Sequence, residues 1–307
     1  MDPLINKKEC QSCKSPLIKY YALRSIFYQC NKCLTIYRSN EKKFNLFNFF
    51  KHPRLKFFST NYKNKSTQFL YFLKFINYVN QEFLVKSKKV KFIEKLLNNY
   101  NKNNLKILDI SGAPGKDAQI LKVNKKVKKI EITEYNKKIV KKINQIIKIK
   151  SLFLDYDCIA KNNINKKYNI IIIWYSIYYS RNLKELILLI KKITLKNGIV
   201  IVASNIPNFG CLTKFSIMES HPPKYFWHYK FLIETFYKED FTVIMKKINN
   251  GSNFITHYFL RNFFKKKLYN IISIFLSIFY IIRNIKNIKS YKKDIKLNDY
   301  ICVFKKN

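Results

Sequence analysis

The sequence predicts an α/β fold in which a doubly wound, mostly parallel, seven-stranded sheet follows a small cysteine-containing ribbon. Three observations predict it. Short apolar runs alternate with segments of helical periodicity, a turn of small residues separates one apolar run from a helix, and two Cys-x2-Cys pairs lie near the N-terminus. We expect a ribbon over residues 1–40, a linker with a helical cap over 41–103, and an α/β domain over 104–307 with a helical insertion at about 260–295.

The two cysteine pairs predict a structural zinc site. The gap between the pairs falls in the range of known zinc sites. Four thiolates at this spacing close a tetrahedral site and leave no open position for catalysis. Short strands over Ile18–Ala22 and Ser25–Gln29 would connect the two halves of the ribbon. The expected zinc ligands are Cys10, Cys13, Cys30 and Cys33.

The cellular compartment expected from the sequence agrees with metal binding. The N-terminus lacks the apolar segment of a secretory signal, so we expect a cytoplasmic protein whose thiols remain reduced. A reducing compartment favours metal over disulfides. The other three cysteines have no partner spacing and are expected to be small buried hydrophobic residues: Cys158, Cys211 and Cys302.

The linker that follows has two parts. Phe44–Asn64 is aromatic and basic without a clear period, which indicates a connection between the ribbon and the α/β domain. Phe69–Tyr100 repeats apolar residues at helical spacing, which predicts one or two helices. We expect these helices to pack as a cap over the ligand site of the sheet.

The most informative segment is Lys106–Gly115, an apolar run that ends in Asp109 and a turn of small residues. A helix is predicted directly after it, over Lys116–Leu121. Small residues let the backbone approach a ligand closely, and the helix N-terminus offers free N–H groups. A strand, turn and helix of this kind form a nucleotide or nucleoside pocket in α/β sheets.

Further strands and helices support this interpretation. Strands are predicted at 126–133, 151–154, 168–174 and 198–203, with helices at 137–149 and 182–194 between them. Because ligands of such sheets bind at the carboxyl ends of the strands, polar residues there should converge on one site. These strand-end residues are Asp109, Glu134, Asp155 and Trp174, with Glu131 as the alternative to Glu134.

Residues 106–249 resemble a class I S-adenosylmethionine-dependent methyltransferase, because Leu108–Gly115 matches the first motif of that family. The resemblance implies that the turn contacts the methionine part of the cofactor, that Glu134 holds the ribose and that Asp155 reaches the adenine. The chain departs from the family at Ser111 and Ala113, where glycines are commoner. The cofactor-binding residues implied are Asp109, Ser111, Gly112, Ala113, Gly115, Glu134, Asp155 and Trp174.

The order of ribbon, helical linker and α/β domain narrows the resemblance to methyltransferases that modify sugars or cell-surface glycans. The resemblance also covers Trp174–Tyr179, Pro207–Gly210 and Pro223–Tyr229. It extends to a closing strand at Asp299–Lys305 that pairs with Phe241–Lys247. It implies a sugar or glycan acceptor, either nucleotide-linked or lipid-linked.

A hydroxyl or carbon acceptor needs a base as well as a methyl donor. The resembling enzymes often carry Glu-His after the fourth strand, where this chain has Tyr178-Tyr179. His228 matches a histidine of the family's Tyr-His-Phe element and becomes the first candidate base. His221, in a loop expected over the site, is the second.

The formal net charge of +42 favours anionic partners. The charge is spread along the chain among residues that AT-rich codons encode, so we attribute most of it to codon composition. Leu268–Ile282 is the most apolar helix candidate, but it is shorter than a bilayer span requires. We expect it to pack on its own domain, with peripheral contact to an anionic inner membrane surface as the alternative.

Two other functions stay open at this stage. The Ala-Pro-Gly turn, the charge and the ribbon would suit an RNA methyltransferase, but the chain has no Asn-Pro-Pro-Tyr-like tetrad after the fourth strand, so nucleic acid is the less favoured partner. Ser111, Ala113 and the Tyr178-Tyr179 pair would suit a non-catalytic binding module on a methyltransferase fold.

Overall fold

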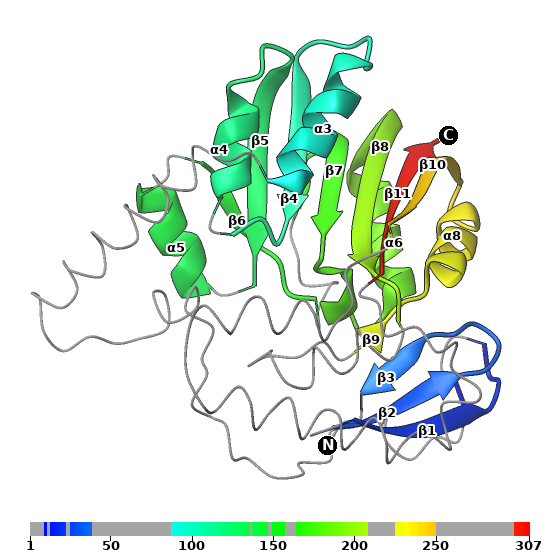
Figure 1. Ribbon diagram of the computed structural model, residues 1–307. Helices are drawn as coiled ribbons and strands as arrows, with labels where there is room; N and C mark the ends of the chain where they lie inside the picture. Colours follow the sequence, from blue (N-terminus) through cyan, green and yellow to red (C-terminus); the bar gives the residue numbers. More distant parts are fainter. Residues whose placement is uncertain are drawn as a thin grey trace, which may run out of the picture.

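The computed structural model of this 307-residue chain describes residues 9–10, 13–22, 25–38, 87–113, 115–135, 137–146, 149–156, 164–207, 225–249 and 298–307. The described residues form one seven-stranded sheet with helices on both faces and one four-stranded sheet beside it (Figure 1). Several expectations fall outside these residues: the Phe44–Asn64 connection, His221, the insertion at 260–295 and the apolar segment within it.

The large sheet has the order expected of a doubly wound fold. From edge to edge its strands are β10 (Phe241–Asn249), β11 (Asp299–Lys306), β8 (Thr194–Asn205), β7 (Tyr168–Trp174), β4 (Leu105–Ile110), β5 (Val127–Glu134) and β6 (Ser151–Phe153). Strand β11 is antiparallel to both neighbours, whereas the strands from β8 to β6 are parallel. The predicted fold class is therefore confirmed.

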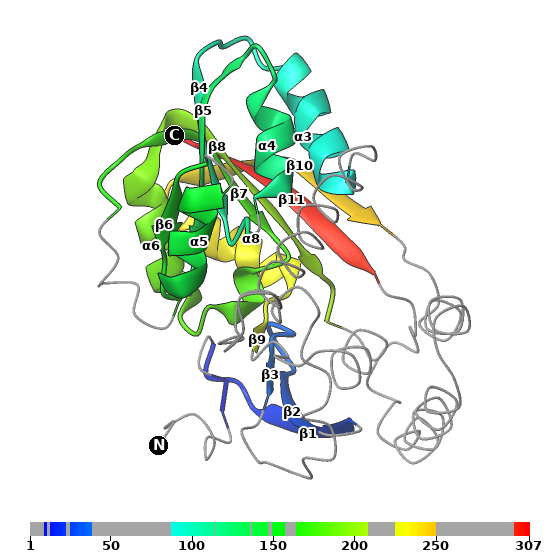
Figure 2. The ribbon, with the colours of Figure 1, turned by 90° about the vertical axis from the view of Figure 1, so that its left-hand side faces the viewer.

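Helices cover both faces of this sheet, which explains the uninterrupted apolar run of β7. Ile170 and Ile172 pack with helices α3 (Lys88–Asn98) and α4 (Lys116–Lys122) on one face. Ile171 and Ile173 pack with α6 (Leu183–Ile193) and α8 (Tyr229–Tyr237) on the other (Figure 2). All four isoleucines are fully buried, and each such side chain contributes about 1.5–3 kcal/mol to folding.

Helix α5 (Lys137–Ile146) follows β5, and a short 3₁₀ helix, η2 (Ile177–Tyr179), follows β7. Helix α3 is the described part of the predicted helical segment Phe69–Tyr100. Among the described residues, no helix is long and apolar enough to cross a membrane.

The largest shift of a strand boundary from the prediction is at the start of β8. Strand β8 begins at Thr194, directly after α6, rather than at Gly198. Lys196, Asn197 and Gly198 resemble a turn in sequence, and Asn197 does adopt a positive φ of 59°. Pairing with β7 is irregular here, because Thr194 pairs with Tyr168 and Ile199 with Ile170. Glycine suits this bend, since a Cβ at position 198 would come within 2.8 Å of the Leu195 carbonyl oxygen.

The small sheet consists of β1 (Leu17–Ala22), β2 (Ser25–Cys30), β3 (Ile36–Arg38) and β9 (Tyr225–Phe226). The first three strands come from the N-terminal ribbon, whereas β9 immediately precedes α8 of the large domain. The ribbon therefore shares backbone hydrogen bonds with the domain it adjoins. Figures 1 and 2 place the ribbon at the carboxyl end of β7 and β8.

Candidate functional site

The turn after β4 is held in a conformation that depends on its small residues. Ser111 has a φ of 58° and Gly115 a φ of 93°, both in the left-handed region. A Cβ on Gly112 would come within 2.5 Å of the Asp109 Oδ2 atom. Only glycine at position 112 is therefore compatible with the observed Asp109 side chain. Ser111 is compatible with the turn, so this departure from the family motif leaves the geometry intact.

Asp109 lies at the centre of a buried charge cluster. Its side chain is fully buried, and its Oδ2 atom accepts a hydrogen bond of 2.5 Å from the Lys89 ammonium of α3. Burial raises the pKa of Asp109, and the positive charge of Lys89 opposes that rise. The Oδ1 atom is also buried and has no hydrogen-bond partner among the described residues. A buried carboxylate oxygen without a partner is costly, which suits a site that a ligand completes.

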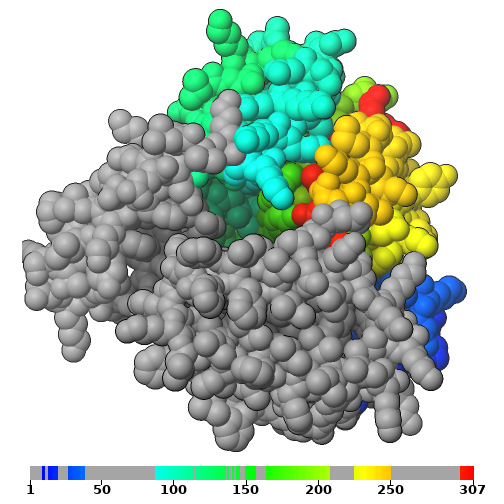
Figure 3. Space-filling model, in the orientation of Figure 1, coloured from blue at the N-terminus to red at the C-terminus, as the bar shows by residue number. Residues whose placement is uncertain are grey.

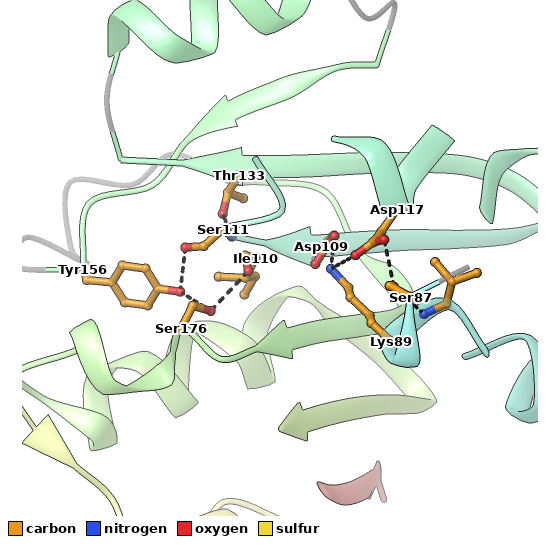
Figure 4. A network of polar contacts seen from close by, with 10 residues as sticks. Ser87, Lys89, Asp109, Ile110, Ser111, Asp117, Thr133, Tyr156 and Ser176 are labelled. Atoms are coloured by element: carbon orange, nitrogen blue, oxygen red, sulfur yellow. Dashed lines mark hydrogen bonds and ion pairs between the residues drawn. The ribbon is translucent and has the colours of Figure 1, made fainter. Parts of the chain in front are cut away.

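A second network joins the carboxyl ends of four strands (Figure 4). The Ser111 hydroxyl donates to the Tyr156 hydroxyl at 3.1 Å, and Tyr156 donates to the Ser176 hydroxyl at 3.2 Å. The Ser111 backbone N–H donates to Thr133 Oγ1 at 3.0 Å. Burial raises the pKa of Tyr156 to about 12, so this phenol stays protonated at neutral pH. The network fixes the β4 turn relative to β5, β6 and β7.

The two acids considered for β5 have different surroundings. Glu134 is the last residue of β5 and lies at the carboxyl edge, as expected for a ligand contact. Glu131 lies inside the strand and accepts a hydrogen bond of 2.8 Å from the Tyr168 hydroxyl. Its carboxylate also pairs with Lys129 and Lys166 at 3.2 Å each. These contacts make Glu131 a structural residue and favour Glu134.

Two other predicted residues also lie at the carboxyl edge. Asp155 follows β6 and is partly buried. Trp174 ends β7, and its ring lies 6.0 Å from that of Phe92 in α3. Figure 3 shows that the surface is hollowed below the cyan atoms of α3. Asp109, Glu134, Asp155 and Trp174 thus all lie at the end of the sheet where doubly wound folds bind ligands.

A half-buried pair that was not predicted lies nearby. Tyr175 follows Trp174 with a φ of 53°, and its hydroxyl donates a short hydrogen bond to Asp299 Oδ2. Asp299 begins β11, and its Oδ1 atom is buried without a hydrogen-bond partner in the described structure. Because β11 is antiparallel, its first residue lies at the edge where the parallel strands end. The available sequence signal for Asp299 was the predicted closing strand Asp299–Lys305, of which it is the first residue.

His228, the first candidate base, caps the N-terminus of helix α8. Its Nδ1 atom accepts a hydrogen bond of 3.3 Å from the Lys230 N–H. His228 is buried and lies against the Tyr229 ring. Tyr178 is buried and Tyr179 half-exposed, with ring centroids 4.8 Å apart. A catalytic role for His228 stays a prediction. Only its Nε2 atom could act as the base, because its Nδ1 atom already accepts the Lys230 hydrogen bond.

The four ribbon cysteines lie together as the sequence predicted. Their Sγ atoms are all within 4.8 Å of one another, including 3.6 Å between Cys10 and Cys33 and 3.3 Å between Cys13 and Cys30. Tetrahedral zinc with Zn–S bonds of about 2.3 Å requires Sγ–Sγ distances of roughly 3.8 Å. The donor set therefore fits a zinc ion.

The two halves of this cysteine cluster have the same backbone geometry. Lys14 N–H donates to the Cys10 carbonyl at 2.8 Å, and Leu34 N–H donates to the Cys30 carbonyl at 3.1 Å. Lys14 and Leu34 each have a positive φ, 61° and 59° respectively. Non-glycine residues rarely adopt this conformation, and it persists where the surroundings enforce it. Two matching turns of this kind indicate a paired metal-binding element.

Aromatic side chains connect the cysteine cluster to the large domain. The Tyr37 hydroxyl lies 3.0 Å from Cys10 Sγ, and the Tyr37 ring packs edge-on against Tyr225 and Trp227. Phe27 packs against Phe226 with ring centroids 6.2 Å apart. The ribbon thus positions the segment that leads into His228 and α8.

Comparison with solved structures finds this fold in proteins of distant sequence. A candidate methyltransferase of Bacillus halodurans C-125 aligns with 12% identity and a TM-score of 0.52, over 72% of this chain and 99% of that one. A candidate sarcosine dimethylglycine methyltransferase of Galdieria sulphuraria aligns with 11% identity and a TM-score of 0.49, over 72% and 86%. No protein-family model and no curated protein matches the chain. The first alignment establishes the Rossmann-like methyltransferase fold.

The surroundings of Glu131 predict a pH-dependent stability. Burial would raise the pKa of this carboxyl, but hydrogen bonds from Tyr168, Lys129 and Lys166 outweigh it and hold the pKa below its usual value. A lowered pKa stabilises the fold above the unfolded value of about 4.3, and this stabilisation is lost as the pH falls through the folded value. Glu131→Gln should lower the free energy of unfolding by about 1–3 kcal/mol at neutral pH. Urea unfolding at several pH values measures it.

In acid the wild type and Glu131→Gln should converge, because the wild-type carboxyl is then protonated. A stability difference that stays constant from about pH 7 to about pH 3 would contradict this account.

Proposed function

We propose that this protein transfers a methyl group from S-adenosylmethionine to a sugar or glycan acceptor. The carrying observation is the β4 turn, where Gly112 leaves room for Asp109 and the buried Asp109 Oδ1 lacks a hydrogen-bond partner within the described parts of the chain. Acids at the ends of β5 and β6 complete the arrangement. The likeness to methyltransferase structures supports the proposal through the fold.

The residues present fit the cofactor. Glu134 would accept hydrogen bonds from the ribose hydroxyls, Asp155 would contact the adenine, and the β4 turn would contact the amino-acid end. Bound there, the cofactor supplies an activated methyl group on a sulfonium sulfur. The chain then has to orient the acceptor, exclude water and remove the acceptor proton.

The acceptor would lie between the sheet edge and the ribbon, which occupies the carboxyl end of β7 and β8. Asp299 is our candidate for the proton acceptor, because its buried Oδ1 atom has no partner in the described structure and Tyr175 fixes the other oxygen. His228 is the alternative through its Nε2 atom. Asp299 or His228 would then act as the base in place of the Glu-His pair of the resembling enzymes, because this chain has Tyr178-Tyr179 at those positions.

Cofactor binding tests the proposal directly. Isothermal titration of S-adenosylmethionine into the purified protein should show saturable binding. Glu134→Gln should weaken it by about 10- to 150-fold, because one charge-assisted hydrogen bond is worth about 1.5–3 kcal/mol. Glu131→Gln is the matched control, since this structural acid should not affect affinity. A folded wild type without affinity would favour a non-catalytic binding module instead.

The ribbon should hold one zinc ion per chain with a structural role. Elemental analysis measures the metal, and Cys30→Ser should abolish its binding and lower the melting temperature. Cys302→Ser is the control, because Cys302 is buried in β11 and is not one of the four clustered cysteines. Full metal content in Cys30→Ser would contradict the assignment.

The proton acceptor can be tested with tritiated S-adenosylmethionine and a panel of nucleotide-linked sugars. Asp299→Asn should retain cofactor affinity and lower kcat about 10²–10⁴-fold, the usual contribution of a general base. Asp240→Asn is the control. Asp240 is 69% exposed and directly precedes β10, whereas Asp299 pairs with Asn249 at the far end of that strand. Unchanged kcat in Asp299→Asn would return the role to His228, and label transfer to RNA alone would overturn the sugar acceptor.

A further inference from the structure

Lys89, Asp109 and Asp117 form a cluster of three charged side chains rather than a single salt bridge (Figure 4). The Lys89 ammonium lies 2.5 Å from Asp109 Oδ2 and 3.8 Å from Asp117 Oδ2. The Ser87 hydroxyl donates to Asp117 Oδ1 at 2.9 Å and accepts from the Val90 N–H, so the α3 N-cap is tied to α4. These three ionisable side chains carry one more negative charge than positive.

The three charged side chains of this cluster differ in exposure. Asp109 is fully buried, Lys89 is 8% exposed and Asp117 is 24% exposed. Lys89 is therefore the more exposed, outer partner of the Lys89–Asp109 ion pair. A lysine has a flexible stem and rotatable donors, so it can exchange one anionic partner for another without a backbone rearrangement.

The Asp109 Oδ1 atom, which has no hydrogen-bond partner among the residues that the structure describes, and the neighbouring Lys89 together match a zwitterion. A buried acceptor with excess negative charge favours an ammonium group, and a lysine at its outer side favours a carboxylate. In the free protein Lys89 serves as the counter-ion of Asp109. A ligand that brings its own ammonium would displace Lys89 from that role and leave it available to pair with the ligand's carboxylate.

We propose that Lys89 is an exchangeable counter-ion that makes this site selective for ligands with an intact α-amino-acid end. Asp109 Oδ1 accepts the ligand's ammonium, and Lys89 moves from Asp109 to the ligand's carboxylate. The inference rests on the proposed function, because S-adenosylmethionine and S-adenosylhomocysteine carry such an end. It adds a specificity residue from α3, outside the β4 turn.

Calorimetry with three probes tests the exchange: S-adenosylhomocysteine, its decarboxylated analogue, which keeps the ammonium, and 5′-methylthioadenosine, which lacks the amino-acid end. The wild type should bind S-adenosylhomocysteine about tenfold or more tightly than the decarboxylated analogue, because a charged hydrogen bond is lost. Lys89→Met should lower this ratio about tenfold, because only S-adenosylhomocysteine loses a carboxylate contact, whereas removal of the competing cation affects both ligands alike. Affinity for 5′-methylthioadenosine should not change.

Lys126→Met is the matched control. The Lys126 ammonium binds the carbonyls of Leu97, Asn98 and Tyr100 at the other end of α3, so its removal loosens this helix without touching the cluster. That variant should keep the wild-type ratio.

Each outcome decides the proposal. Equal wild-type affinity for S-adenosylhomocysteine and its decarboxylated analogue would overturn it without any variant, so a Lys89→Met protein that fails to fold leaves the test intact. An unchanged ratio in folded Lys89→Met would make Lys89 a structural residue. If the wild type binds all three probes equally, the inference fails while the proposed function stands, and binding of none would overturn both.

Discussion

The contact between Gly112 and the Asp109 carboxylate is the constraint on which the candidate site depends. Asp109 is fully buried at the end of β4, and its Oδ2 atom occupies the space where any side chain at position 112 would begin. This close approach shapes the turn after β4. The turn places Ser111 in a hydrogen-bond network with Thr133, Tyr156 and Ser176. That network fixes four strand ends relative to one another, and the Asp109 Oδ1 atom at the end of β4 still lacks a partner among the described residues.

Much of the sheet could be predicted because its signals are local. Four consecutive isoleucines in β7 indicate a strand buried on both faces, and the small-residue turn after Asp109 indicates a ligand site. Contacts that depend on distant segments could not be predicted. The structural role of Glu131 depends on Tyr168 and Lys166, and the Asp109 pair depends on Lys89 from a preceding helix. Asp299 reaches the site only through the antiparallel placement of β11.

The ribbon is part of the domain architecture rather than an independent appendage. Its strand β3 pairs with β9, and Tyr37 contacts both the cysteine cluster and the aromatic residues that precede α8. Cysteine spacing predicted the cluster, because metal-ligand geometry is encoded over a few residues. The spacing could not show where the ribbon docks, since that depends on strand pairing with residues almost 200 positions away.

The central claim is that the carboxyl ends of β4, β5 and β6 bind one adenosyl ligand. A crystal structure of the zinc-replete protein with S-adenosylhomocysteine tests it most directly. The account predicts the ribose at Glu134, the adenine beside Asp155 and the homocysteine ammonium on Asp109 Oδ1. Electron density for the ligand at another surface, or an empty strand edge at saturating ligand, would contradict it.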